Sequence, residues 1–93
     1  MALRWAKPKD PDDIDFFELN WRKALKGDTI DGSIWILPAG ITSTLTEILD
    51  NGSRTRVWLT GGTSGKKYIL TNRVTTVIGR QLDQSVELTV ASN

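Results

Sequence analysis

The side chains of this sequence that could do chemistry are carboxylates, hydroxyls and lysines, because it contains no histidine and no cysteine. These absences exclude a Cys/His zinc site, an iron–sulfur cluster, a disulfide framework, a thiol nucleophile and an imidazole base. The densest carboxylate cluster is Asp10, Asp12, Asp13 and Asp15. Hard cations bind carboxylate oxygens, but this cluster lacks the sharp-turn glycine and the closing glutamate of a calcium loop. We therefore predict a solvated, turn-forming segment here and no metal site.

Residues 61–67, with the sequence GGTSGKK, share only superficial features with a phosphate-binding loop. The hydroxyl residue that should follow the lysine is missing. A phosphate-binding loop also opens a helix, whereas the pattern from Tyr68 onward predicts a strand. We interpret the stretch as a flexible corner, and no cofactor is expected.

Asp83 and Glu87 are two further carboxylates that could act together in catalysis. Two carboxylates can hydrolyse a glycoside without histidine. Here, however, they share the outward side of the expected final strand, where charged side chains are ordinary. We therefore predict that the protein is not an enzyme.

Arg54, Arg56 and Trp58 alternate along one predicted strand and so share one of its faces. Two arginines on that face argue that it points outward, while the alternate positions face the core. Because tryptophan and arginine dominate binding hot spots, the three residues predict a protein interface. In the alternative, Trp58 is the core tryptophan and the faces are reversed, but Trp21 and Trp35 are better core candidates because neither shares its face with arginine.

The charge balance and the hydropathy argue against two classes of partner. Twelve basic side chains against eleven acidic ones give a net charge of +1, without the basic excess usual for nucleic-acid modules of this size. An apolar run long enough to span a membrane is missing, as is a secretory leader. We expect no nucleic-acid and no membrane partner.

Length and composition indicate a single all-β domain preceded by a charged arm. Residues 1–31 carry 13 charged side chains against 10 in residues 32–93, while ten of the eleven threonines lie after residue 31. Val, Ile, Thr and aromatic residues make up a third of the chain, and turn signals separate short runs of them, as in a β-sandwich. Pro8 and Pro11 favour an extended N-terminal arm. We therefore divide the chain into an arm, residues 1–13, and a sandwich, residues 14–93.

Alternating side chains predict the strands and their faces. Phe17, Leu19 and Trp21 share the inner face of the first strand. In the third strand, Ile41 and Leu45 share a face and alternate with threonines. Strands are expected at residues 14–21, 29–37, 41–49, 54–60, 67–76 and 80–91, with a helical turn at residues 21–25.

Four apolar residues have no place in the predicted core. Ile34 and Ile36 lie on the second face of their strand, so they need a partner if nothing within the chain covers them. Leu3 and Trp5 lie in the arm, outside any predicted strand. We expect the arm to dock on a neighbouring subunit through these two residues, so that its removal would leave the sandwich folded.

Two features of the sequence resemble known families. The Gly-Thr turn before Tyr68 resembles the corner of immunoglobulin-like and fibronectin type III sandwiches, in which the tyrosine hydroxyl bonds to backbone a few residues upstream. A wider resemblance, from about Lys9 to Val90, is to the phage fiber-tail adaptors. Its blocks are KDPD at 9–12, NW at 20–21, GDTI at 27–30, Trp35, PAG at 38–40, VWLTGGT at 57–63, YILTNRVTT at 68–76 and GR at 79–80.

The resemblance implies an all-β, immunoglobulin-like or fibronectin III-like β-sandwich of six or seven antiparallel strands with an extended N-terminal arm. It also implies a structural adaptor in the virion tail of a phage or prophage, made in the host cytoplasm and present in several copies. Its partners would be other tail or fiber proteins. A host-surface or carbohydrate-binding module on the same fold is the alternative, with Trp58 as the stacking platform. The expected interface residues are Leu3, Trp5, Ile34, Ile36, Arg54, Arg56 and Trp58.

Overall fold

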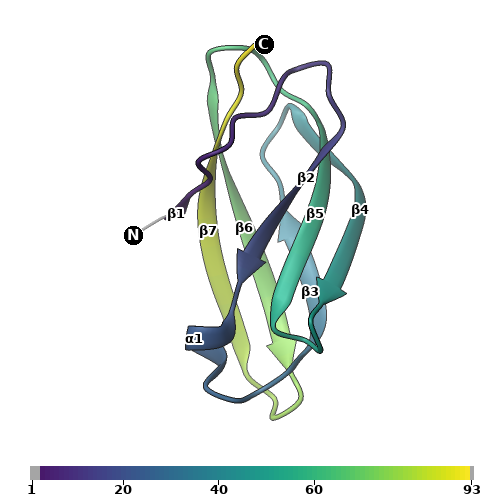
Figure 1. Cartoon of the computed structure of the whole chain (residues 1–93), viewed down its shortest axis with the longest axis vertical. Helices are drawn as coiled ribbons and strands as arrows, with labels where there is room; N and C mark the ends of the chain where they lie inside the picture. Colours follow the sequence, from purple (N-terminus) through teal and green to yellow (C-terminus); the bar gives the residue numbers. More distant parts are fainter. Residues whose placement is uncertain (1–2, 93) are drawn as a thin grey trace.

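The computed structural model describes residues 3–92 and is a sandwich of two β-sheets (Figure 1). One sheet has the strand order β1-β7-β6-β3 and the other the order β2-β5-β4. A single helical turn, α1 (Arg22–Leu25), follows β2. The strands are β1 (Leu3–Arg4), β2 (Asp15–Asn20), β3 (Ile30–Ile36), β4 (Ile41–Leu49), β5 (Arg54–Gly61), β6 (Lys67–Thr76) and β7 (Gln81–Thr89).

The architecture confirms the prediction of an immunoglobulin-like β-sandwich. Each predicted strand is present with its ends within two residues of the expected positions, and the predicted helical turn is α1. All neighbouring strands pair in the antiparallel sense except β1, which runs parallel to β7. The arm therefore supplies a strand that the alternation of the sequence does not reveal.

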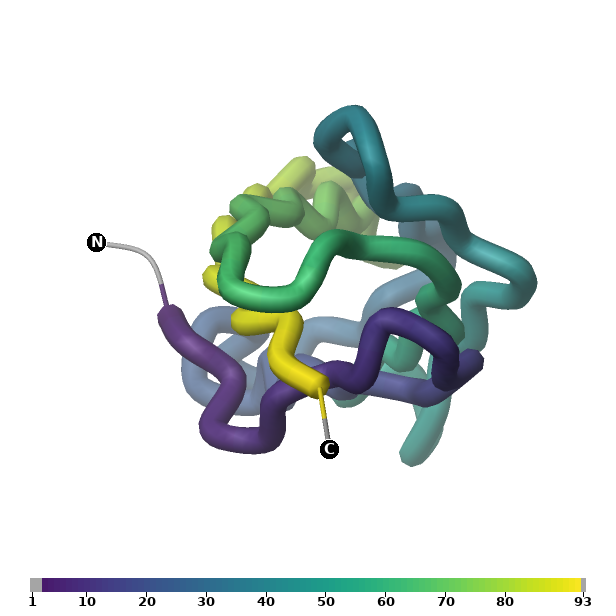
Figure 2. The backbone as a smooth tube through the Cα atoms, turned by 90° about the horizontal axis from the view of Figure 1, so that it is seen from above, coloured from purple at the N-terminus to yellow at the C-terminus, as the bar shows by residue number. Residues whose placement is uncertain are grey.

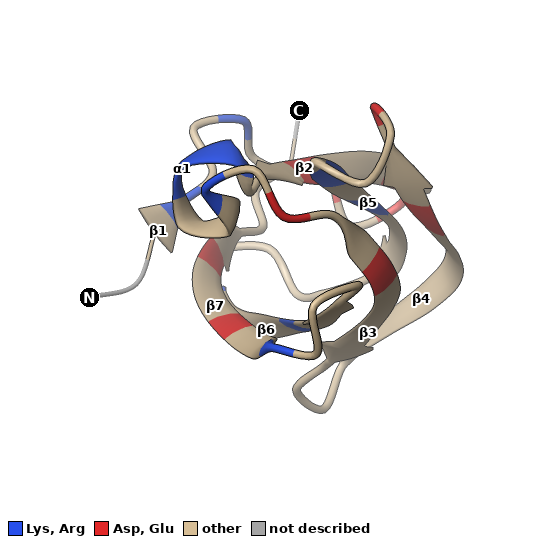
Figure 3. Cartoon of the chain, turned by 90° about the horizontal axis from the view of Figure 1, so that it is seen from below, with Lys and Arg blue, Asp and Glu red and all other residues tan. Residues whose placement is uncertain are grey.

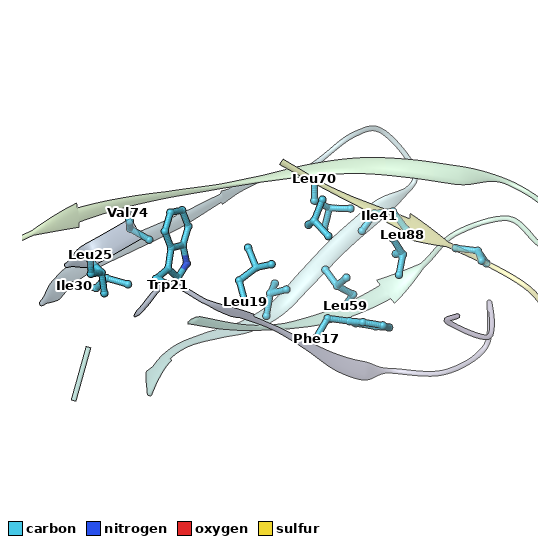
Figure 4. Close-up of a cluster of buried hydrophobic side chains, with 13 residues drawn as sticks. Phe17, Leu19, Trp21, Leu25, Ile30, Ile41, Leu59, Leu70, Val74 and Leu88 are labelled. Atoms are coloured by element: carbon cyan, nitrogen blue, oxygen red, sulfur yellow. The ribbon is translucent and has the colours of Figure 1, made fainter. Parts of the chain in front are cut away.

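The inner faces of the two sheets form one hydrophobic core (Figure 4). Val57 and Leu59 of β5 are completely buried, which confirms that Arg54, Arg56 and Trp58 face outward. The remaining buried apolar residues are Phe17, Leu19, Trp21, Leu25, Ile30, Ile41, Leu70, Val74, Val86, Leu88 and Val90. Trp35 is partly buried and packs against this core.

A buried hydrogen-bond network joins the two sheets within the core. The Trp21 Nε1 group donates to Thr55 Oγ1 and to Asn72 Oδ1, each at 3.1 Å, and the Thr55 hydroxyl donates to Asn72 Oδ1 at 2.6 Å. The Asn72 amide nitrogen donates to Ser33 Oγ and to the Ile34 carbonyl, each at 2.9 Å. Since buried polar groups without partners are costly, this network favours one alignment of the sheets.

The predicted tyrosine corner is present. Tyr68 accepts a 2.9 Å hydrogen bond at its hydroxyl from the backbone N–H of Thr63, five residues upstream. Hydrogen bonding with the side chain of Thr63, and next with its backbone, lowers the pKa of the Tyr68 hydroxyl. The ring lies over Gly40, whose φ of 97° is in the left-handed region that favours glycine. The corner thus fixes the connection between β5 and β6 against the turn that precedes β4.

The N-terminal arm lies against the sandwich of its own chain. The Trp5 ring packs against Phe17 and Trp35, with ring centroids 4.9 and 6.0 Å away, and its Nε1 donates a 2.8 Å hydrogen bond to the Glu18 carbonyl. Trp5 therefore has cover within the chain, which differs from the expectation that it needs a neighbouring subunit. Leu3 remains 52% exposed, and residues 1–2 of the expected arm lie outside the described residues.

Lys9 connects the C-terminal half of the arm to the sandwich. This side chain is fully buried, and its Nζ donates 2.8 Å hydrogen bonds to the carbonyls of Asp10 and Gly61. Its backbone forms a parallel bridge with Val90. In the end-on view, the purple N-terminal segment accordingly runs beside the yellow C-terminal segment (Figure 2). One lysine thus connects the arm to β5 and to the end of β7.

An ion pair holds the end of the sandwich that carries α1. Arg80 Nε lies 3.1 Å from the Asp28 carboxylate, and Arg80 Nη2 donates a 2.7 Å hydrogen bond to the Leu25 carbonyl at the end of α1. Burial by itself raises the pKa of Asp28, but hydrogen bonds from Thr76, Thr29 and Arg80 outweigh it and hold that pKa below its usual value. Asp28 therefore favours its charged form in the folded protein.

Acid should destabilise the fold through this carboxylate. Because the pKa of Asp28 is lower in the folded chain, its stabilising contribution is present above the unfolded value of about 4 and is lost as the pH falls through the folded value. We expect the unfolding temperature, measured by circular dichroism, to fall between about pH 5 and pH 2, and to fall less in Asp28→Asn. Parallel curves for the two proteins would contradict this assignment. Asp83→Asn is the control, because its partly exposed pair with Arg73 contributes less.

Candidate protein interface

The outer face of the β2-β5-β4 sheet carries an apolar row that crosses all three strands. Phe16 and Leu45 lie directly opposite Trp58 in the strand register, on either side of it. The rings of Phe16 and Trp58 are tilted by 52°, with centroids 5.1 Å apart. Phe16 is 37% exposed and Leu45 is 54% exposed. We call Phe16, Trp58 and Leu45 the apolar row.

A row of paired charges runs beside the apolar row. Arg56 lies between Glu18 and Glu47 in the register, with side-chain ion pairs of 2.7 and 3.5 Å. The hydrogen bond with Glu18 raises the pKa of the Arg56 guanidinium. Arg54 pairs with Glu18 at 3.2 Å and with Asp50 at 3.0 Å. Blue and red positions accordingly lie close together across this sheet (Figure 3).

Charged side chains fix the orientation of the two aromatic rings in the apolar row. Trp58 Nε1 donates a 2.9 Å hydrogen bond to Glu47, and the Arg56 guanidinium lies 4.6 Å from the centroid of the Phe16 ring. Each arginine is engaged by carboxylates, so the face is close to neutral and presents a fixed aromatic surface. A pre-ordered surface of this type loses little side-chain entropy when a protein binds to it.

The residues expected at the interface do not form one site. Arg54, Arg56 and Trp58 lie together on the outer face described above. Ile34 and Ile36 lie on the outer face of the other sheet, 56% and 46% exposed. Leu3 and Trp5 lie in the arm, at the seam between the two sheets. The structure therefore has two separate outer faces and a seam.

Leu45 and Phe16 were not among the interface residues expected from the sequence. Leu45 was expected on the face of Ile41, but a register shift between Ser43 and Leu45 inserts Thr44 and turns Leu45 to the opposite, outer face. That prediction is therefore wrong. Phe16 shares the outer face with Glu18, and its alternation with the buried Phe17 was the available signal.

The hairpin between β6 and β7 exposes two further apolar side chains. Val77 and Ile78 are 67% and 76% exposed at its tip. The backbone there is fixed, since Val77 N–H donates to the Thr29 carbonyl at 2.9 Å and Gly79 N–H to the Thr76 carbonyl. From the sequence, residues 77–79 were expected only to connect two strands.

The acidic segment at residues 10–15 contains a local turn. Asp10 accepts a 2.8 Å hydrogen bond from the backbone of Asp12, as expected for a turn-forming segment. Within residues 3–92, no group of three or more potential metal ligands is found, and no pocket either. None of the described helices is long and apolar enough to cross a membrane.

Comparison with known proteins first places the chain by class. Its fold is similar to the solution structure of the PKD domain from the KIAA 1837 protein, with a TM-score of 0.53 and 22% sequence identity. The match covers 100% of this chain and 89% of that one. The similarity shows that the chain has an immunoglobulin-like β-sandwich fold.

The family follows from the sequence itself. Residues 9–89 match the family model of Gp77, described as the podophage GP4 fiber-tail adaptor protein gp77. The chain belongs to this family of phage tail adaptors, which confirms the resemblance noted in the sequence. None of the curated proteins matches the chain.

Proposed function

We propose that this protein is a non-enzymatic tail adaptor that binds other tail or fiber proteins through the outer face of its β2-β5-β4 sheet. Membership of the fiber-tail adaptor family supports the role. It also supports a location in the virion tail, with synthesis in the cytoplasm of the host bacterium. The partners are proteins, with no nucleic acid or membrane among them, and the chain acts in several copies.

The observation that carries the proposal is the apolar row beside internally paired charges, in which Phe16 and Leu45 are exposed and Trp58 between them is half-buried. Tryptophan and arginine at the centre of an interface contribute most of the binding energy, and a ring of polar groups around them excludes water. Trp58 is central in the row, with Arg56 next to it. A partner that covers Phe16 and Leu45 would remove both from solvent without leaving an unpaired charge.

Truncation of the central residue should weaken adaptor binding. We expect Trp58→Ala to weaken the binding of the fiber protein from the same phage by about 30-fold or more, as for a hot-spot tryptophan. Leu45→Lys, which places a charge in the row, should have an effect in the same direction. The measurement is isothermal titration calorimetry with the purified fiber protein.

The control is Val77→Lys, which adds the same charge at the tip of the hairpin between β6 and β7. These two strands belong to the other sheet. It should bind like the wild type. Equal losses in Leu45→Lys and Val77→Lys would contradict the assignment of the face. Saturable binding on a glycan array that Trp58→Ala abolishes would favour a carbohydrate-binding module instead.

A further inference from the structure

The two seams of the sandwich are closed to different degrees. At the seam between β2 and β7, the arm covers both edges. β1 pairs with β7, Trp5 Nε1 donates to the Glu18 carbonyl of β2, and Lys7 Nζ lies 3.5 Å from the Phe16 carbonyl. Covering an edge in this way removes the unpaired backbone groups to which another strand could pair.

The opposite seam, formed by β3 and β4, is bridged at the start of β3, where the Ile30 N–H donates a 2.9 Å hydrogen bond to the Gly52 carbonyl, but it is open farther along β3. Among the described residues, β3 pairs only with β6, and β4 only with β5. The edge of β4 is irregular at Thr44 and carries Glu47 in its remaining regular part. Bulges and charges of this kind are the devices that block strand addition. β4 is therefore protected from pairing with another strand.

β3 lacks these devices over most of its length. Its register with β6 shifts only between Ile30 and Gly32, and residues 32–36 are regular and contain neither a charge nor a proline. The Ile34 carbonyl accepts a hydrogen bond from Asn72 on β6 and so points towards that strand. Because backbone groups alternate in direction along a strand, those of Ser33 and Trp35 point away from β6, into the open edge.

We propose that a second copy of this chain pairs with the β3 edge in the antiparallel sense, about a two-fold axis at Ile34. In this register Ile34 meets Ile34 of the second copy, Ser33 meets Trp35, and Gly32 meets Ile36. The backbone groups of Ser33 and Trp35 then bond to each other across the interface. The two four-stranded sheets become one continuous sheet.

The side chains of β3 suit a second copy of the same strand. Ile34 and Ile36 stand on the outer face, 56% and 46% exposed, and the two copies would cover one another there. Like charges do not meet, because Asp31 would lie opposite Leu37. Arg73, which lies opposite Ile34 on β6, forms a bidentate pair with Asp83 at 2.9 and 3.0 Å within the chain. A self-complementary strand of this kind gives a closed two-fold dimer.

This inference deepens the multi-copy role in the proposed function, but its test needs no tail partner. The purified chain should show a concentration-dependent monomer–dimer equilibrium in sedimentation equilibrium. Ile34→Lys, which places two ammonium groups at the axis, should weaken dimerisation by about 30-fold or more. Ile69→Lys is the matched control, since Ile69 is 50% exposed on the same outer face but lies on β6, away from the edge.

A mixture of variants tests the two-fold axis itself. Only an axis at Ile34 places residue 34 of one copy against residue 34 of the other. Ile34→Lys and Ile34→Glu should each be monomeric, and an equimolar mixture should dimerise again. A monomeric wild type at millimolar concentration, equal losses in Ile34→Lys and Ile69→Lys, or no recovery in the mixture would each overturn the proposal. Failure of fiber binding with an intact dimer would instead contradict the proposed function alone.

Discussion

Deletion of residues 1–10 should abolish cooperative thermal unfolding of the domain. The deletion removes β1, the Trp5 ring that packs on Phe17 and Trp35, and the buried Lys9 that bonds to the Gly61 carbonyl. It uncovers part of the core and both edges at the β2–β7 seam. Differential scanning calorimetry should show a broad, weak transition in place of one sharp peak.

A point substitution tests how much the Trp5 side chain alone contributes to stability. Trp5→Ala should lower the free energy of unfolding by about 2 to 3 kcal/mol, less than for a fully buried tryptophan because Trp5 is half-buried. Lys7→Ala, also in the arm but exposed, should change it by less than about 0.5 kcal/mol. If the deletion variant unfolds as sharply and at the same temperature as the full chain, the arm is a docking element only.

Substitution of Asn72 by alanine should destabilise the protein by about 3 to 4 kcal/mol, since several buried polar groups lose a partner at once. Asn72 receives hydrogen bonds from Trp21 and Thr55 and donates to Ser33 and the Ile34 carbonyl. It is completely buried, so water cannot replace these bonds without entering the core. Urea unfolding followed by tryptophan fluorescence measures the loss.

The control is Thr71→Ala on the same strand. Thr71 faces outward and shares one 2.9 Å hydrogen bond with Ser85, so its loss should cost less than about 1 kcal/mol. A double-mutant cycle between Trp21→Phe and Asn72→Ala should give a coupling energy above about 1 kcal/mol. Additive effects of the two substitutions would show that the network contributes no more than its separate contacts.

The local pattern of side chains predicts most of the fold. In β5 the alternation is strict, and Val57 and Leu59, which alternate with the outward-facing residues, are completely buried. The tyrosine corner was predictable for the same reason, since it depends on a turn and a tyrosine only a few residues apart. Contacts between neighbours in sequence can be predicted because the pleat of a strand fixes their directions.

Contacts between distant segments could not be predicted in this way. Arg54, Arg56 and Trp58 were correctly placed on an outer face, but the apolar row depends on which strands flank β5. The place of Leu45 in that row depends on the extra residue Thr44, which no turn signal marks. A bulge is decided by packing against the partner strand, and one sequence does not show that packing.

The N-terminal arm is a second example of contacts between distant segments that could not be predicted from the sequence. Pro8 and Pro11 predict an extended segment, but nothing near them indicates that Leu3 and Arg4 pair in parallel with Val86 and Glu87. Parallel pairing brings together residues far apart in sequence and needs no turn between them. The expectation of an arm without internal contacts followed from the absence of any local signal.

The position of β7 has a consequence for the order of folding. It is the last of the described strands to be synthesised, yet it lies in the interior of its sheet, between β1 and β6. The arm therefore has no strand to pair with, and Lys9 no bridge to Val90, until residues 81–90 have left the ribosome. Contacts of such high sequence separation slow folding. A chain that stops before β7 lacks Val86 and Leu88 of the core and leaves the arm without its partner strand, so we expect folding to await the synthesis of β7.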